Sequence, residues 1–310
     1  MRRFAMLALA AGLVAGAAAA HAAGPTFATI DNPGDPTFNQ LLGINNAGTI
    51  SGYFGSGAAG HPNQAYTIAA PYTKFVPANV PDSAQTQATG INAAGMVTGF
   101  WAPTNTGTDA NYGFIRYDDH GHYVYIDVND PLGGGGVPVV NQVLGINQAG
   151  YAAGFYNDAN GAAHGFVYQV ATAAYRPVTV GGATAAAATG INNNNLICGF
   201  YIDKKGVTHG FLKPLTGGGA VSLTVPHAPV TQLLGVNSRG VAVGFYVDSN
   251  QLTHGVLYNP ANGECQTIDD PSGTNGTVVN GLNDKNELVG FYTDAANNVH
   301  GMLVTGAGAP

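Results

Sequence analysis

Charged residues are scarce in this chain of 310 residues, which has 10 lysines and arginines and 17 aspartates and glutamates. Without Arg2 and Arg3 the balance is 8 basic against 17 acidic side chains, a net charge of 8 − 17 = −9. Affinity for a phosphate backbone depends on lysine and arginine contacts, so this deficit argues against nucleic-acid binding. We expect no nucleic-acid partner.

Cysteine is nearly absent, since the chain has only Cys198 and Cys265. An exported protein could join them in a disulfide. However, the two residues fall at non-equivalent places in different copies of a sequence repeat, and this disfavours a bridge. Whether they are free thiols stays open from the sequence.

Long apolar runs are missing after Ala22. The stretch before this point begins with Arg2 and Arg3, continues as an apolar run from Phe4 to Ala20, and ends in small residues, which is typical of a secretory signal peptide. No later run reaches the roughly 18 apolar residues that a membrane helix needs. We expect residues 1–22 to be a signal peptide and residues 23–310 to form a single domain, exported to the periplasm or the cell exterior without a membrane span.

Glycine is abundant, with 46 residues, and it is placed periodically. Six times the chain repeats Gly-(Ile/Val/Leu)-Asn, a turn, and a second glycine. Successive copies begin about 40 to 50 positions apart, a spacing that is typical of propeller blades. The pairs are Gly43/Gly52, Gly90/Gly99, Gly145/Gly154, Gly190/Gly199, Gly235/Gly244 and Gly281/Gly290.

Each copy predicts four short strands. In the fifth copy we expect strands at 231–237, 241–246, 254–258 and 265–269, with Asn262-Gly263 as a hairpin turn between the last two. Only glycine or asparagine stands at the turn after the first strand, because both tolerate the left-handed conformation. The sequence therefore predicts an all-β fold, a six-bladed β-propeller with four-stranded blades.

The two ends of the chain indicate how the last blade is completed. The sixth copy stops after its third strand, at His300–Val304, whereas Phe27–Pro33 is a near copy of Gln266–Pro271, the outer strand of the fifth blade. We expect the N-terminal strand to complete the last blade and to close the ring, which would protect an exposed sheet edge.

These motifs carry a family resemblance. Gly-Ile-Asn-Asn-Ala-Gly at residues 43–48, with His-Gly-Phe at 164–166 and 209–211, resembles the HAF family of extracellular repeat proteins, which is named for a His-Ala-Phe triplet. The resemblance covers residues 26–305, although glycine replaces the alanine of the triplet and blades one and two lack its histidine. It implies export and a propeller-like repeat, and it carries no catalytic residues to transfer.

Pairs of the form Asp-x5-His are the most prominent candidates for chemistry. An aspartate and a histidine together could hold a metal or exchange protons. Four copies in four blades instead favour a structural hydrogen bond across each hairpin, so we expect neither a metal nor a cofactor. The pairs are Asp158/His164, Asp203/His209, Asp248/His254 and Asp294/His300.

Loop length separates blades one and two from the others. The stretch from the second glycine to the triplet position, Gly52–Gln64 in blade one and Gly99–Tyr112 in blade two, is longer than its counterpart Gly244–His254 in blade five. The stretch Tyr112–Gly145 is likewise longer than its counterpart His254–Gly281. In a propeller these loops emerge on one face, and insertions in repeat proteins often mark the binding face.

We expect ligand binding on this face, through the residues of the insertions or through glutamines near the mouth of the central channel. The recurring glutamines also favour a structural amide ring, and an alternative interpretation of Trp101 is a packing substitute for the tyrosine of other blades. The candidates in the insertions are His61, Asn63, Trp101, Asn105, Asp109, Asn111, Tyr112 and Asp130. The channel candidates are Gln40, Gln87, Gln142 and Gln232.

The leading functional hypothesis is a binding module for a small-molecule or glycan ligand, because aromatic rings and polar groups together suit a sugar. One alternative is a glycan-acting hydrolase or lyase with two paired carboxylates, since glycoside hydrolysis requires such a pair. A surface scaffold for a protein partner is a further alternative. Catalysis itself stays open. Carboxylates considered for the enzyme are Asp35, Asp82, Asp109, Asp130 and Asp270, with His61 or His227.

Overall fold

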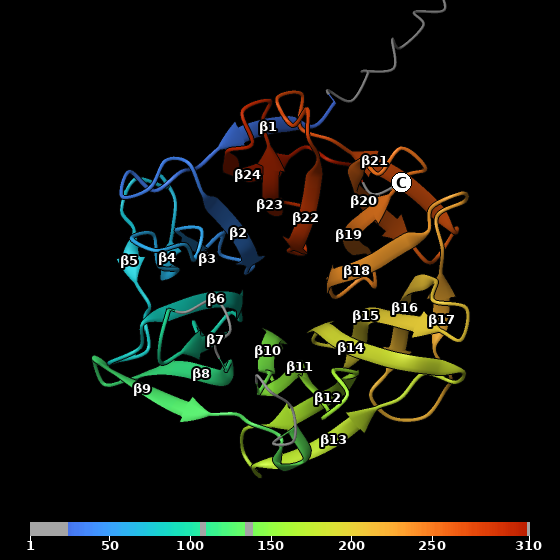
Figure 1. Cartoon of the computed structure of the whole chain (residues 1–310), viewed down its shortest axis with the longest axis horizontal. Helices are drawn as coiled ribbons and strands as arrows, with labels where there is room; N and C mark the ends of the chain where they lie inside the picture. The colour runs from blue at the N-terminus through green and yellow to red at the C-terminus, as the bar shows by residue number, and fades with distance from the viewer. Residues whose placement is uncertain (1–23, 106–109, 134–138, 309–310) are drawn as a thin grey trace, which may run out of the picture.

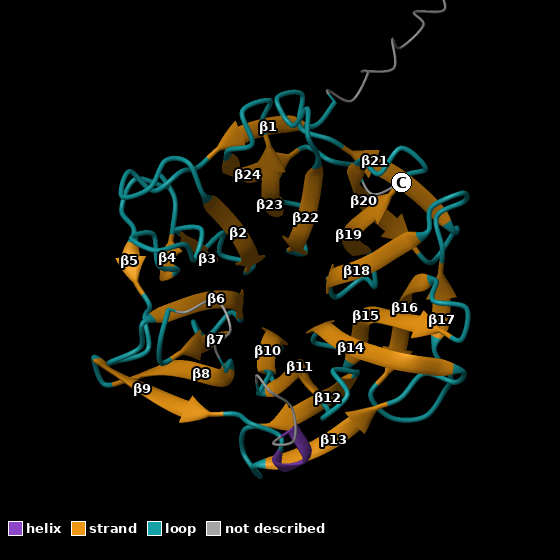
Figure 2. Ribbon diagram, viewed as in Figure 1, coloured by secondary structure: helices purple, strands orange, loops and turns teal. Residues whose placement is uncertain are grey.

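The computed structural model describes residues 24–105, 110–133 and 139–308. This part of the chain forms strands, turns and one short 3₁₀ turn, η1 (Pro131–Gly133), and Figure 2 shows the strands arranged radially. The candidate Asp109 and the expected signal peptide lie outside the described residues. Within them, no helix is long and apolar enough to cross a membrane.

The strands follow the repeat of the sequence, and we call the group of strands from each copy a unit. Unit 1 contains β2 (Asn39–Ile44), β3 (Ile50–Phe54), β4 (Gln64–Ile68) and β5 (Val76–Pro77). Unit 2 contains β6 (Gln85–Ile91), β7 (Val97–Ala102), β8 (Tyr112–Asp119) and β9 (His122–Asp127). Unit 3 contains β10 (Asn141–Ile146), β11 (Tyr151–Asn157), β12 (Ala163–Gln169) and β13 (Ala174–Val178).

The second half of the chain repeats this order. Unit 4 contains β14 (Ala183–Ile191), β15 (Leu196–Asp203), β16 (Thr208–Pro214) and β17 (Val221–Leu223). Unit 5 contains β18 (Val230–Val236), β19 (Ala242–Val247), β20 (Thr253–Asn259) and β21 (Glu264–Ile268). Unit 6 contains β22 (Thr277–Leu282), β23 (Leu288–Thr293) and β24 (Val299–Thr305), joined by β1 (Thr26–Thr29).

Neighbouring strands within a unit run antiparallel, with the first strand of each unit innermost (Figure 1). Units 1, 2 and 6 are separate four-stranded sheets, whereas units 3, 4 and 5 form one sheet of twelve strands. Only single parallel pairings join units within that sheet, His164 to Ala186 and Thr208 to Val230. The larger sheet is therefore three repeats that are joined by little backbone pairing.

The regular spacing within each copy has a steric origin. A Cβ added at Gly244 would lie 1.8 Å from the backbone oxygen of Gln232, so only glycine allows β18 and β19 to approach this closely. At the turn between the first two strands, Asn195 has a φ of 59°, in the left-handed region. Both observations confirm that the repeat motif serves the backbone.

The asparagine of each Gly-x-Asn motif links its unit to the next. Each side-chain Nδ2 donates to the backbone oxygen of the asparagine that follows, at 2.7 to 3.3 Å, and the sixth donates back to the first. Their Oδ1 atoms accept N–H groups of their own turns, as at Asn192. All are buried. The residues of this asparagine ring are Asn45, Asn92, Asn147, Asn192, Asn237 and Asn283.

The N-terminal strand joins the last unit. β1 pairs antiparallel with β24, with Thr26 opposite Thr305 and Thr29 opposite Met302. The Oδ1 atom of Asp31 accepts the backbone N–H of Gly301 at 2.9 Å, and its Oδ2 lies 2.7 Å from Nδ1 of His300. The expected outer strand of unit 6 is therefore present.

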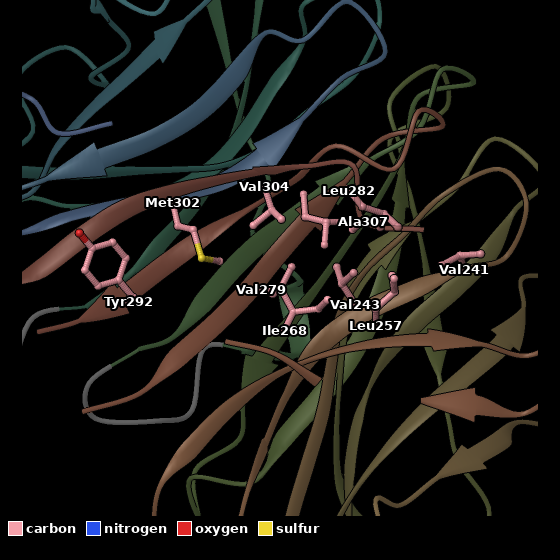
Figure 3. Close-up of a cluster of buried hydrophobic side chains, with 11 residues drawn as sticks. Val241, Val243, Leu257, Ile268, Val279, Leu282, Tyr292, Met302, Val304 and Ala307 are labelled. Carbon is pink, nitrogen blue, oxygen red and sulfur yellow. The ribbon is translucent and has the colours of Figure 1, made fainter. Parts of the chain in front are cut away.

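The hydrophobic core is divided into layers between neighbouring units. Figure 3 shows one layer, in which Val243, Leu257 and Ile268 of unit 5 pack with Val279 and other residues of unit 6. These four side chains are at most 1% exposed. Such aliphatic positions thus hold adjacent units face to face, and they set the shape of any space left between them.

Candidate functional site

A cavity of about 300 Å³ lies between units 3 and 4, and we call it the 3–4 cavity. This volume is at the lower end of the range for small-molecule sites. Asp130 and Leu132 reach it from the connection between units 2 and 3, Tyr156 from β11, His164 from β12 and Tyr175 from β13. The long connection noted in the sequence therefore borders the site.

The floor of the 3–4 cavity is open because β14 presents very small side chains. Ala185 and Ala186 line the cavity. Counting from the first glycine of each motif, the equivalent residues of unit 5 are Val230 and Thr231, and Thr231 is fully buried. At the junction between units 4 and 5, the side chains of Val230 and Thr231 fill the corresponding space. At the junction between units 3 and 4, alanine methyl groups leave it open.

Asp130 supplies a carboxylate to the wall of the 3–4 cavity. The residue is only 8% exposed. Its Oδ1 accepts the backbone N–H of Leu132 at 2.9 Å, and its own N–H donates to Oδ1 of Asn141 at the same distance. This aspartate is held in place by its connection and lines the cavity.

The two tyrosines of the 3–4 cavity keep their phenolic protons. Burial and then the charges of Asp130 and Asp158 raise the pKa of Tyr156 above its usual value of 10.0. Burial is also the main cause of the raised pKa of Tyr175, with smaller contributions from Tyr168 and Asp130. Neutral phenols can both donate and accept hydrogen bonds, and their rings present apolar faces.

His164 stands at the rim of the cavity, with 44% of its side chain exposed. Its ring stacks on Tyr156, with the centroids 5.2 Å apart, and its Nε2 lies 3.0 Å from Oδ2 of Asp158. The hydrogen bond from His164 is the largest cause of the lowered pKa of Asp158, followed by the backbone N–H of Ala162. Asp158 is therefore an anchored, ionised group.

The same stack and ion pair recur outside the cavity, so they are structural features of the repeat. The rings of Tyr201 and His209, and those of Tyr246 and His254, are each 5.0 Å apart. The four Asp–His pairs have N–O distances from 3.0 to 3.7 Å. The expected hydrogen bond across the hairpin is present in units 3, 4 and 6, whereas in unit 5 His254 bonds to Asp269 and lies 3.7 Å from Asp248. Within the described residues, no group of three potential ligands could hold a metal ion.

Trp101 and Tyr112 of unit 2 occupy the place of the Tyr–His stack. Their ring centroids are 5.3 Å apart, and they stand opposite each other on β7 and β8. This geometry favours the interpretation of Trp101 as a packing substitute. Among the described residues the buried Nε1 of Trp101 has no hydrogen-bond partner, and ligand binding by this residue stays a prediction.

The remaining candidates of units 1 and 2 bond to neighbouring polar groups. His61 is exposed, and its Nδ1 lies 2.8 Å from Oδ2 of the buried Asp35. Burial opposes ionisation of Asp35, but hydrogen bonds from Thr37 and His61 outweigh it and lower the pKa. The Oδ1 of Asn105 accepts a hydrogen bond from Gln85 at 2.7 Å. The first contact ties the loop of unit 1 to the segment before β2, and the second fixes the loop of unit 2 to its own first strand.

The channel glutamines do not form a ring with one another. Gln87 donates to Oδ1 of Asn63 and Gln142 donates to Oδ1 of Asn111, each at 2.8 Å and each to the preceding unit. Gln40 and Gln232 occupy the matching places on β2 and β18. The amide ring of this protein is instead the asparagine ring.

Several spaces lie along the central channel, with volumes of about 90, 110 and 100 Å³, and each is smaller than the 3–4 cavity. One of these spaces has a volume of about 100 Å³. It is lined by the residues that precede the first glycines, which are Leu42, Thr89, Leu144, Thr189, Leu234 and Asn280. The 3–4 cavity, which lies between units, is therefore larger than any one of these axial spaces.

Of the predicted ligand-binding residues, the structure thus places Asp130 in the 3–4 cavity, while Trp101, His61 and Asn63 lie in units 1 and 2. Sequence reasoning missed Tyr156 and Tyr175. The signal that could have revealed them is the alanine run at 185–188, where the fifth copy carries larger residues.

Comparisons with known proteins identify the architecture. No protein-family model and no curated protein matches the chain. Among solved structures, AofleA from Arthrobotrys oligospora superposes with a TM-score of 0.55 at 11% identity, covering 92% of this chain and 93% of that protein. YjhT gives a TM-score of 0.52 at 11% identity, with 88% and 96% covered.

A sialidase from Trypanosoma rangeli has a TM-score of 0.54 at 7% identity, covering 92% of this chain. This chain spans 60% of the length of that enzyme, which has also been solved with bound sialic acid. These neighbours are β-propeller proteins, and the likeness shows that this chain shares their fold.

Proposed function

We propose that this protein is an exported, closed six-bladed β-propeller that binds an uncharged glycan in the 3–4 cavity. The six repeats, the pairing of β1 with β24 and the continuous asparagine ring support closure. A signal peptide at residues 1–22 and membership in the HAF-type repeat family belong to the same proposal. An N-terminal sequence of the secreted protein that begins near residue 23 would support export, whereas retention of residues 1–22 would contradict it.

The observation that carries the proposed binding function is the lining of the 3–4 cavity. Tyr156 and Tyr175 offer ring faces for the apolar side of a sugar, while Asp130 and the phenols can bond its hydroxyls. No lysine or arginine is among the described residues that line it, and Asp130 places a carboxylate there. This charge disfavours acidic sugars. A cavity also fits a small ligand better than a flat scaffold for a protein partner.

The test compares two equivalent tyrosines in binding assays with neutral mono- and oligosaccharides. Tyr156→Ala removes a ring from the 3–4 cavity, whereas Tyr246→Ala removes the same stacked ring in unit 5. We expect Tyr156→Ala to weaken binding by about tenfold, since aromatic contacts contribute about 0.5–1.5 kcal/mol beyond area burial. Tyr246→Ala should leave the affinity unchanged. Equal effects of both changes, or no binding by the unaltered protein, would refute the site.

Hydrolysis of a glycan is less well supported than binding. A general acid that works near neutral pH needs a raised pKa. Every carboxyl group with a displaced pKa in the described residues has it lowered, including Asp35 and Asp158. Turnover of a glycan that is lost in Asp130→Asn would reverse this preference and assign the cavity to an enzyme.

A further inference from the structure

Five of the six junctions between units share one hydrogen bond that closes the space between them. In each, a backbone N–H shortly after the outer strand of one unit donates to a threonine or asparagine oxygen near the start of the next unit. The distances are 2.7 to 3.1 Å. The pairs are Asn32/Asn39, Val80/Thr86, Asp130/Asn141, Val225/Thr231 and Asp270/Thr277.

The junction between units 3 and 4 lacks this hydrogen bond. By alignment of the copies, the donor there is Val180 and the acceptor position is Ala186, whose methyl group cannot accept. Among the hydrogen bonds of the described residues, none uses the N–H of Val180. The following residue is Gly181, where the other five junctions have proline. Both Val180 and Ala186 line the 3–4 cavity.

Resting on the proposed glycan-binding function, we propose that the ligand supplies the missing acceptor through the carbonyl oxygen of an acetamido group. The 3–4 cavity would then take a neutral N-acetylated sugar. Two of the five intact junctions use an asparagine amide oxygen in this role, at Asn39 and Asn141. An acetamido group presents the same carbonyl chemistry.

The apolar part of the lining distinguishes an acetamido group from a plain hydroxyl. Ala185, Ala186 and Val178 line the cavity with methyl groups beside the acceptor position. An acetyl methyl can pack against them, whereas a hydroxyl would leave this apolar surface uncovered. The sugar ring then lies toward Tyr156 and Tyr175. A sialic acid shares the acetamido group, but its carboxylate would meet Asp130 with no basic side chain among the described residues of the lining.

The experiment measures binding of N-acetylglucosamine and of glucose, which differ at the acetamido group, to the purified protein. We expect the N-acetylated sugar to bind about tenfold more tightly, the value of one hydrogen bond and its buried methyl. In the protein's amide NMR spectrum, the Val180 resonance should shift on addition of N-acetylglucosamine. N-acetylneuraminic acid should bind no better than glucose.

Two variants test the hydrogen bond at this junction and at the next one. Ala186→Thr restores the acceptor of the other junctions, so it should protect the Val180 amide from hydrogen exchange without sugar and weaken N-acetylglucosamine binding by about tenfold or more. Thr231→Ala removes the acceptor at the next junction. It should expose the Val225 amide to exchange and leave sugar binding unchanged.

The outcomes decide between the two levels of the proposal. Equal affinities for glucose and N-acetylglucosamine, or a Val180 amide that does not respond to bound N-acetylglucosamine, overturn the acetamido inference while leaving glycan binding in place. If Ala186→Thr keeps full affinity, the acceptor position is not where the ligand binds. Absence of binding by every neutral sugar refutes both proposals.

Discussion

Removing one member of the asparagine ring should destabilise the whole protein. Asn192 is 5% exposed, and its side chain bonds at both its oxygen and its nitrogen. Its Nδ2 donates to the backbone oxygen of Asn237 at 2.7 Å, and its Oδ1 accepts the N–H groups of Asn194 and Leu196, each at 2.9 Å. After Asn192→Ala the oxygen of Asn237 would keep the N–H of Gly240 as a donor. The N–H groups of Asn194 and Leu196, in the turn that joins β14 to β15, would lose their acceptor.

We expect Asn192→Ala to lower the free energy of unfolding by about 2–4 kcal/mol. A buried group left without its partner costs about 1–3 kcal/mol, and each further hydrogen bond contributes about 1 kcal/mol. This is a large fraction of the roughly 5–15 kcal/mol by which proteins of ordinary stability are folded.

Urea unfolding followed by the fluorescence of Trp101, the only tryptophan, measures this loss. The matched control is Asn193→Ala, one position further along, where the side chain is exposed. We expect that control to change the free energy of unfolding by less than about 0.5 kcal/mol. The slope of the free energy against urea should stay constant, because the surface exposed on unfolding is similar. If Asn192→Ala changes the free energy of unfolding no more than Asn193→Ala does, the reasoning is refuted.

Three further predictions concern the closing strand and the thiols. Burial disfavours protonation of His300, but hydrogen bonds and charges from Asp31 and Asp294 outweigh it and raise the pKa above 6.5. The stabilisation is complete below the unfolded pKa and is lost as the pH rises through the folded pKa. The gap in Tm between the unaltered protein and His300→Gln should therefore narrow from about pH 6 to pH 9, and a constant gap would contradict it. Deleting residues 24–35 removes β1 and should cause aggregation or loss of cooperative unfolding. A truncated protein that melts like the intact one would contradict this prediction. Cys265 is exposed, whereas burial raises the pKa of Cys198 to about 12, so a thiol reagent should label one cysteine in the folded protein and two in denaturant; two labels in the folded state would be inconsistent with this.

Much of the fold was predictable because the repeat leaves few residue choices. Positive φ at Asn195 and close backbone approach at Gly244 restrict what can stand there, so the motif recurs in readable form. The expected strands of the fifth copy agree with β18, β19, β20 and β21 to within about two residues, the usual uncertainty of element ends. The pairing of β1 with β24 was likewise visible as a sequence copy.

The candidate site was harder to predict, since it arises from what one junction lacks. Asp130 was found through the long connection that carries it. Ala186 looks unremarkable until it is aligned with Thr231 and the contact across the junction is known. Trp101 attracted attention by its rarity; it fills the place of an ordinary tyrosine, and its role in binding stays a prediction. Loop length therefore identified Asp130 as a candidate, but it gave no indication of the alanines of β14 that line the same cavity.

The joining of β1 to β24 also sets an order of events in folding. The contact between Asp31 and His300 joins positions 269 apart in the sequence. Closing so long a loop adds little to the free-energy cost, because that cost grows only with the logarithm of length, but non-local pairings slow folding. Units 2 to 5 take all their strands from one continuous stretch of the chain, so each can form and pack on its neighbours locally. Unit 6 is complete only when β1, from the opposite end of the chain, pairs with β24. We expect the first strand of the sequence to be the last to dock, and the slowest folding phase to report its arrival.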